Sequence, residues 1–390
     1  MPVVPRGAGG SGVDAGKRRI WWWGVAGAAV VLVLLSGCAQ GAPQDYLHPR
    51  GPMAAKTYHL FKQIFWFAVV PVFVIIEGLL VVSIFRHRHR PGRGDPVETD
   101  APPKLRWVVV PALIMMLVDL APFGEEARTT FELARAPGGD VLDVEVYGHM
   151  WWWEFVYPGY RVPKTPASYR LTTANELHIP TGRPVRLVLR SIEPGLRSLP
   201  DFKSASASDL PTGVIHSFWV PQLAGKQDVV PGHENKLTLI ADKPGVYQGQ
   251  CAEFCNLSHA NMRLRVVAQT PDDFDAWITA QKRAVVKPES GPAAEGYQLF
   301  VGKGGCLACH TAVGVEGNSF ARVGPNLTHL KSRETFAGAT FANTADNLKR
   351  WVKDPPAMKP MRPEAGTGMP NRGLSKEEVD KIVAFLETLQ

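Results

Sequence analysis

The metal-binding side chains of this 390-residue sequence concentrate in one run, CAEFCNLSHANM at residues 251–262, which we call the cysteine loop. A mononuclear blue-copper centre uses one Cys, two His and a weak axial Met. Cys251 or Cys255, together with His259, Met262 and the earlier His216, would complete such a centre. The remaining thiol predicts a second copper, with both thiolates bridging the metals and one His capping each. Such a site would transfer electrons and would make or break no bonds.

Zinc is the alternative metal for two Cys and two His. A zinc site would need neither Met262 nor the cupredoxin-like, strand-rich segment around the loop, so the pattern favours copper. Glu253 lies between the two thiols. Either its side chain is a solvated carboxylate, or its backbone carbonyl faces one of the coppers.

A second motif, CLACH at residues 306–310, is the C-x-x-C-H pattern that attaches haem covalently. The thiols of Cys306 and Cys309 would bond to the haem vinyl groups, and His310 would take one axial position on the iron. Three methionines are available for the opposite position: Met358, Met361 and Met369. A Met followed by Pro shortly before the last helix suits a distal ligand loop, so we expect Met369 rather than Met361.

The fifth cysteine, Cys38, ends the sequence LSGC behind a basic KRR at 17–19 and an apolar stretch from 20 to 35. This resembles a bacterial lipoprotein signal over residues 1–37, with a lipid on the Cys38 sulfur and an extracytoplasmic segment at 38–60. No cysteine then remains for a structural disulfide.

Two apolar segments, 61–85 and 105–123, are long enough to cross a membrane. Six basic residues cluster around the loop between them, 86–104: Arg86, Arg88, Arg90, Arg93, Lys104 and Arg106. They predict a cytoplasmic loop, which places everything after residue 123 outside. Haem attachment through C-x-x-C-H also occurs outside in bacteria. We therefore expect a multi-pass protein of the bacterial cytoplasmic membrane with periplasmic domains. The net charge of +7 could favour nucleic acid, but no dense basic tract with interleaved aromatics is present, so lipid is the expected partner.

The rest of the chain predicts two domains. Alternating apolar residues and Pro-Gly turns over 140–281 indicate a cupredoxin-like antiparallel β-sandwich, with a solvated loop from 193 to 213 overhanging its copper end. Residues 282–293 have linker composition. Residues 294–390 predict an all-α haem domain whose last helix starts with a capping box at Ser375 and Glu378. The predicted fold is thus a transmembrane hairpin, a sandwich and a helical domain.

Three runs carry a family resemblance: IHSFWVP at 215–221, KQDVVPG at 226–232 and PGVYQGQCAEFC at 244–255. They resemble subunit II of haem-copper cytochrome c oxidases. The C-terminal C-x-x-C-H domain makes the chain similar to the caa3-type form, in which a cytochrome c domain is fused to that subunit. The resemblance extends from about Tyr58 to the C-terminus.

The resemblance implies roles for particular residues. Cys251 and Cys255 would bridge a dinuclear copper (CuA) centre, His216 and His259 would be its terminal ligands, and Met262 and the Glu253 carbonyl would be weak ligands. The Glu253 carboxylate would also reach a magnesium ion shared with subunit I. Trp151, in the sequence GHMW, matches the position through which electrons arrive from cytochrome c.

The resemblance also implies the activity of a cytochrome-c oxidase. Electrons from cytochrome c or another periplasmic donor would pass through the haem and CuA to subunit I, which reduces oxygen to water. Two alternatives remain: a CuA subunit of a nitric-oxide reductase, and a membrane-anchored copper carrier. Lys104 stands where the family often has a carboxylate associated with proton uptake. Either Glu98 substitutes for it or the channel differs, so we assign no proton-uptake role.

Overall fold

The computed structural model describes residues 45, 47–87, 104–135, 138–191, 214–318 and 320–390. Several predictions fall outside the described residues: the signal segment 1–37, the lipidation of Cys38, most of the basic loop 86–104, and the loop from 193 to 213. From Tyr46 to the C-terminus the chain forms one compact unit. The elements below all belong to that unit.

Both apolar segments are helical, and both helices are longer than the sequence indicated. The first runs without a break through α2 (Pro52–Ile64), the π-helical η1 (Phe65–Val69) and α3 (Val70–His87), and the second is α4 (Arg106–Ala134). In the parts that extend beyond 61–85 and 105–123 the two helices also meet through polar side chains: the Lys56 ammonium lies 2.8 Å from the Glu132 carboxylate.

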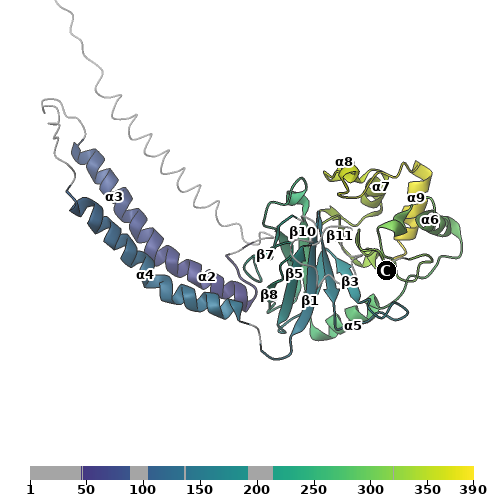
Figure 1. Ribbon diagram of the computed structural model, residues 1–390, viewed down its shortest axis with the longest axis horizontal. Helices are drawn as coiled ribbons and strands as arrows, with labels where there is room; N and C mark the ends of the chain where they lie inside the picture. The colour runs from purple at the N-terminus through teal and green to yellow at the C-terminus, as the bar shows by residue number, and fades with distance from the viewer. Residues whose placement is uncertain (1–44, 46, 88–103, 136–137, 192–213, 319) are drawn as a thin grey trace, which may run out of the picture. The chain divides into compact units, whose positions relative to one another are not determined.

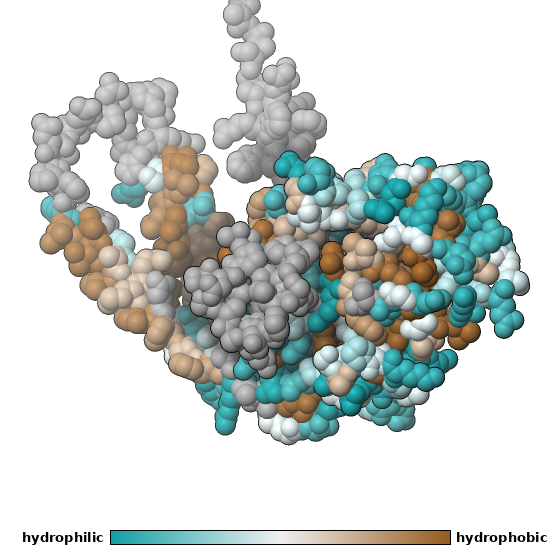
Figure 2. All heavy atoms as spheres, turned by 45° about the vertical axis from the view of Figure 1, so that its right-hand side comes forward, coloured by the Kyte–Doolittle hydropathy of each residue, from teal (hydrophilic) through white to brown (hydrophobic). Residues whose placement is uncertain are grey.

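By length and composition alone, the spans Pro52–Arg86 and Val108–Glu132 could each cross a membrane. Figure 1 shows the helices side by side, and Figure 2 shows largely apolar, brown side chains on their outer surface. Side chains such as Phe67 (82% exposed) have no protein cover in the described chain. An apolar surface of this kind needs lipid or another subunit around it.

The next segment forms the predicted β-sandwich, which we call the sandwich domain. Strand propensity and period-two alternation place Val144, Val146, Leu187 and Leu189 inside, all with 0% exposure. The first sheet has the order β3-β2-β1-β5-β8, and the second has the order β4-β10-β9-β6-β7. The strands are β1 (Leu142–His149), β2 (Trp152–Tyr157), β3 (Leu171–Ala174), β4 (Glu176–Pro180), β5 (Val185–Ser191), β6 (His216–Trp219), β7 (Gln227–Val229), β8 (Asn235–Leu239), β9 (Gly245–Cys251) and β10 (Arg263–Gln269).

The prediction of a wholly antiparallel sandwich needs one correction. Strand β1 pairs with β5 in parallel, and β10 pairs with β4 in parallel. The chain leaves the first sheet after β3, crosses to the second as β4 and returns as β5, and such a crossover permits parallel pairing. Alternation within a strand marks its buried face but not its partner or direction, so the sequence pattern did not indicate this.

Helix α5 (Pro271–Gln281) ends the sandwich domain, and the helices that follow form a C-terminal helical domain. The capping box at Ser375 and Glu378 is confirmed at the start of the last helix. One departure from the all-α prediction is a short hairpin of two-residue strands, β11 (Thr335–Phe336) and β12 (Phe341–Ala342). The helices are α6 (Gly291–Val301), α7 (Ala345–Lys353), α8 (Pro355–Met358) and α9 (Lys376–Leu386).

The crossing of α6 and α9 holds the C-terminal helical domain together. Tyr297 and Phe300 of α6 pack edge-on against Phe385 of α9, with ring centroids 5.4 and 5.2 Å apart. The backbones touch at Gly296, where a Cβ atom would lie 1.9 Å from the carbonyl oxygen of Lys381. Only glycine fits this position without moving the helices apart.

We expect Gly296→Ala to lower the free energy of unfolding of this domain by about 1–3 kcal/mol, the usual cost of overpacking. Scanning calorimetry of the detergent-solubilised chain measures the shift of its transition. Gly159→Ala is the control, because a Cβ at Gly159 would meet nothing within 4 Å. An unchanged transition for Gly296→Ala would show that the crossing tolerates a methyl group.

Candidate metal and haem sites

The cysteine loop connects two neighbouring strands of the second sheet. Strand β9 ends at Cys251, and Met262 stands immediately before β10, after the 3₁₀ turn η3 (His259–Asn261). The Cys251 amide donates to the Met262 carbonyl at 2.9 Å, which closes the base of the loop. The Ala252 amide donates to the carbonyl of Ser217 on β6, also at 2.9 Å, which holds the loop beside His216.

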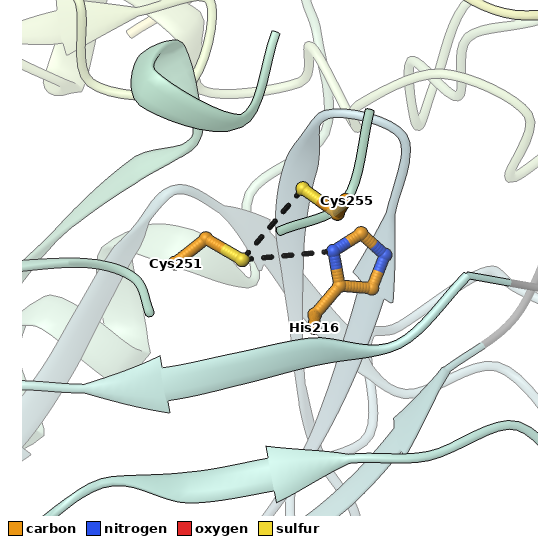
Figure 3. A group of neighbouring side chains, drawn as sticks. All are labelled: His216, Cys251 and Cys255. Carbon is orange, nitrogen blue, oxygen red and sulfur yellow. Dashed lines mark hydrogen bonds between the residues drawn. The ribbon is translucent and has the colours of Figure 1, made fainter. Parts of the chain in front are cut away.

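The Cys, His and Met side chains that sequence analysis selected for the metal come together at this loop, as does the backbone carbonyl of Glu253. Figure 3 shows the His216 ring and the two cysteine sulfurs pointing toward one another. The ligand atoms of His216, Cys251 and Cys255 all lie within 4.8 Å of one another. The individual separations are Cys251 Sγ to Cys255 Sγ 3.7 Å, Cys251 Sγ to His216 Nδ1 3.8 Å, Cys255 Sγ to His259 Nδ1 3.6 Å, Cys255 Sγ to Met262 Sδ 3.8 Å, and Cys251 Sγ to the Glu253 carbonyl oxygen 3.2 Å.

The sulfurs of Cys251 and Cys255 are 3.7 Å apart, so each thiol changes the pKa of the other. The pKa of Cys251 is lowered well below its usual value, first by the hydrogen bond between the two sulfurs and then by the neighbouring His216. The pKa of Cys255 is raised by the same hydrogen bond and by burial. Without metal the pair therefore gives up one proton readily and the second reluctantly, whereas a bound cation favours loss of both.

The donor set fits a soft metal. Two buried thiolates and two imidazoles suit copper or zinc, and the additional thioether and carbonyl exceed the four ligands of a tetrahedral zinc site. Cys251, Cys255 and Met262 are at most 4% exposed. The side chain of Glu253 is exposed at the loop surface, while its carbonyl oxygen faces Cys251.

The second motif lines an apolar cavity of about 290 Å³. Cys306 and Cys309 lie on its wall at the 3₁₀ turn η4 (Cys306–Ala308), together with His310. The Nδ1 atom of His310 hydrogen-bonds to the Pro325 carbonyl at 2.7 Å, which leaves Nε2 for a metal. Burial lowers the pKa of His310, so the imidazole is neutral, as an iron ligand requires.

Two of the three candidate methionines border this cavity, where they could bind an iron on the side opposite His310. Met361 and Met369 both line it, whereas Met358 is not among the lining residues. An apolar cavity bordered by a C-x-x-C-H turn, a neutral His and a thioether fits a haem. The preference for Met369 over Met361 stays a prediction.

The sandwich domain supplies part of the same cavity wall. Trp151 and Trp152, in and after the turn between β1 and β2, line the cavity together with Met150 and Asn175. Trp151 is 3% exposed, and its indole Nε1 donates to the carbonyl oxygen of Cys255 at 2.7 Å. One side chain therefore contacts the cysteine loop and borders the haem cavity.

Buried polar contacts join the two domains around this cavity. Arg322 Nε donates to Glu154 Oε1 at 2.7 Å, and Glu154 is 2% exposed. Lys359 donates to the carbonyl oxygen of Trp151 at 2.7 Å, and burial lowers the pKa of this lysine to about 7. Sequence analysis selected Trp151 but not Arg322, Glu154 or Lys359. Lys359 and Trp151 are 208 positions apart, and a lone charged residue carries no pairing signal.

Two family descriptions match the chain in these domains. "Cytochrome C oxidase subunit II, periplasmic domain" matches residues 142–269, and "Cytochrome c" matches residues 293–390. Fold and sites thus define a two-domain electron-transfer protein, with copper and haem as the cofactors that the domains imply.

Relatives extend the match to nearly the whole chain. Cytochrome c oxidase subunit 2 of Bacillus subtilis is 31% identical over 388 residues, covering 93% of this chain and 96% of the relative. The same subunit of Alkalihalophilus pseudofirmus is 30% identical over 368 residues, covering 92% and 94%. A solved structure, the periplasmic domain of subunit II of cytochrome oxidase (CoxB) of Bradyrhizobium japonicum, is 23% identical, with a TM-score of 0.28, covering 38% of this chain and 97% of that one.

The chain belongs to the cytochrome c oxidase subunit 2 family and carries a fused cytochrome c domain. The family expectation from the sequence is thereby confirmed. As an oxidase subunit II, the protein takes up electrons for the oxidase and associates with other oxidase subunits.

Proposed function

We propose that the cysteine loop and His216 hold a dinuclear copper (CuA) centre, and that the cavity holds a covalent haem c. In this assignment Cys251 and Cys255 bridge the metals and His216 and His259 cap them. The weak ligands are Met262 and the Glu253 carbonyl. The haem is attached through Cys306 and Cys309, with His310 and Met369 as its axial ligands. When bound, the two centres supply reversible one-electron carriers.

The main support for this proposal is that sulfur, nitrogen and oxygen atoms converge around Cys251 and Cys255. Five separations of 3.2–3.8 Å join groups from β6, β9 and the loop. Each partner is of a type that copper accepts. A carrier that hands its metal on would need open, easily exchanged ligands, whereas these sulfurs are buried.

We further propose the direction of electron flow. An external donor, cytochrome c or another periplasmic protein, delivers electrons to the C-terminal helical domain. They then cross to the sandwich domain beside Trp151 and continue to subunit I, which reduces oxygen to water. Because both domains are in one chain, electron transfer from the helical domain to the sandwich domain is intramolecular. Turnover should therefore depend less on the concentration of a soluble cytochrome c.

We also propose how the protein is anchored and oriented in the membrane. The helices within 61–85 and 105–123 anchor the protein in the cytoplasmic membrane, a lipid on Cys38 adds to this anchor, and the domains at 140–281 and 294–390 lie on the periplasmic face. The exposed Glu253 carboxylate reaches a magnesium ion shared with subunit I. Consumption of oxygen rather than nitric oxide by the purified complex would test the choice of oxidase.

We expect Cys255→Ser to remove the copper pair while leaving the haem in place, because the Cys255 sulfur contacts Cys251, His259 and Met262. Metal analysis should fall from two coppers per chain to one or none, and the near-infrared absorption should disappear.

Cys309→Ser is the reciprocal control. It should weaken covalent haem attachment, seen by haem staining of the denatured chain, and leave copper content unchanged. Two coppers retained in Cys255→Ser, or a zinc ion in the wild-type chain, would contradict the copper assignment.

We expect Gly324→Ala to disturb iron ligation by His310. A Cβ at Gly324 would lie 2.6 Å from Cε1 and 2.8 Å from Nδ1 of the imidazole, so the ring must shift. The visible spectrum of the haem should report a weakened axial ligand, with thioether attachment intact. Gly138→Ala, where a Cβ meets nothing within 4 Å, is the control. A spectrum identical to wild type would argue against His310 as a ligand.

A further inference from the structure

We propose that Lys359 is a positioning residue that fixes the C-terminal helical domain against Trp151, so that the haem cavity and the cysteine loop keep one separation. The purpose of this contact rests on the electron route proposed above, but the contact itself does not. Lys359 is 3% exposed. Its Nζ donates to the carbonyl oxygens of Trp151 at 2.7 Å and Ala337 at 3.0 Å, one in each domain.

A lysine is a costly residue to bury at this place. Its amino group loses water on burial, and the partners given above are neutral carbonyls. An apolar side chain of similar length would fill the space without that cost. Lys359 instead donates hydrogen bonds to two carbonyl oxygens. A methionine at this position would leave both without this donor. Ammonium and neutral amine both donate hydrogen bonds, so the contact does not require the charged form.

The contacts around Lys359 link the cysteine loop to a segment that lines the haem cavity. Ser258, next to His259, donates to the carbonyl of Pro360, which precedes Met361, at 2.5 Å. On the other side, the Arg263 amide donates to the Gly338 carbonyl at 3.0 Å, directly after Met262. A shift of the lysine segment would therefore move groups adjacent to both proposed centres.

Gly338 shows how closely the domains approach at this point. Its φ of 79° is in the left-handed region, and a Cβ there would lie 2.5 Å from the Asn261 carbonyl oxygen and 2.8 Å from Lys359 Nζ. The Thr340 hydroxyl donates to the same Asn261 oxygen at 3.1 Å. The cysteine loop is thus in direct backbone contact, at Asn261, with the β11–β12 turn.

The position of Lys359 lets it influence electron transfer between the two sites. Trp151 receives the Lys359 hydrogen bond on its carbonyl and donates from its indole to Cys255. The same tryptophan borders the cavity that contains Cys309 and His310. A hydrogen bond that fixes the Trp151 backbone therefore fixes the residue that lies between the two sites. The hydrogen bonds of Lys359 go to backbone carbonyls, its amino group also interacts electrostatically with the Cys255 thiol, and its side chain borders the cavity.

The test compares Lys359→Met with Lys353→Met in the full chain. Lys353 is the matched control, because its Nζ also donates to a backbone carbonyl, that of Leu374, but within the helical domain. Hydrogen exchange is followed at amides bonded across the domain contact: Arg263 to Gly338, and Glu334 and Thr335 to the Glu176 carboxylate. We expect about tenfold faster exchange at these amides in Lys359→Met, because the contact opens more often, and no change in β1.

A second measurement separates positioning from simple structural support. Photoinduced reduction of the haem in the loaded chain, followed at the copper absorption, should show about tenfold slower transfer in Lys359→Met, because small misplacements cost large factors in rate. Lys359→Gln keeps an N–H donor and should give intermediate values in both experiments. It also provides a second variant should Lys359→Met fail to fold.

The outcomes are distinct. Exchange and transfer rates equal to those of Lys353→Met would overturn the proposal. Faster exchange with unchanged transfer would make Lys359 structural only, which also overturns it. If the wild-type spectra lacked copper or covalent haem, the electron route would fail while the exchange result still stood. Slower transfer with unaltered spectra of both centres and faster exchange would establish the positioning role.

Discussion

The hydrogen bond from the Trp151 indole to the carbonyl oxygen of Cys255 joins the two sites that the rest of the chain supports. Trp151 follows β1 in the first sheet, and Cys255 follows β9 in the second, so this bond spans the sandwich. It forms only when the sheets are correctly packed, which Trp153 and Phe218 enforce with rings 5.3 Å apart at right angles. A buried indole N–H without an acceptor would be destabilising, so the bond also fixes the ring orientation.

Rigid support of this kind matters more for an electron carrier than for a carrier of metal. The proposed ligands come from a strand end, a neighbouring strand and a loop closed by the hydrogen bond between Cys251 and Met262. Each is held by backbone pairing before any metal arrives. A centre held in this way changes little in geometry when its charge changes, as fast electron transfer requires.

Much of this arrangement could be predicted from sequence, because its signals are local. The cysteine loop and C-x-x-C-H are short patterns with specific chemistry, and the capping box at Ser375 marks a helix start through contacts three residues apart. What could not be predicted depends on distant pairs. The parallel pairing of β1 with β5 is decided by a crossover between sheets. The contact of Lys359 with Trp151 arises only after two domains have folded.

The chemistry of the domain contact explains how one chain can hold its two domains in a single orientation. Apolar surfaces attract one another in many registers, whereas buried charged groups are tolerated only where their partners lie in place. Glu154 meets Arg322, and Glu176 accepts the amides of Glu334 and Thr335 while buried at 3% exposure. A displaced register would remove the partners that the helical domain supplies to these two buried carboxylates. The covalent linker keeps the domains together, and these contacts select the register that places Trp151 at the cavity wall. Among the described residues Trp151 is 3% exposed, so the proposed route has an outside donor deliver its electron to the helical domain.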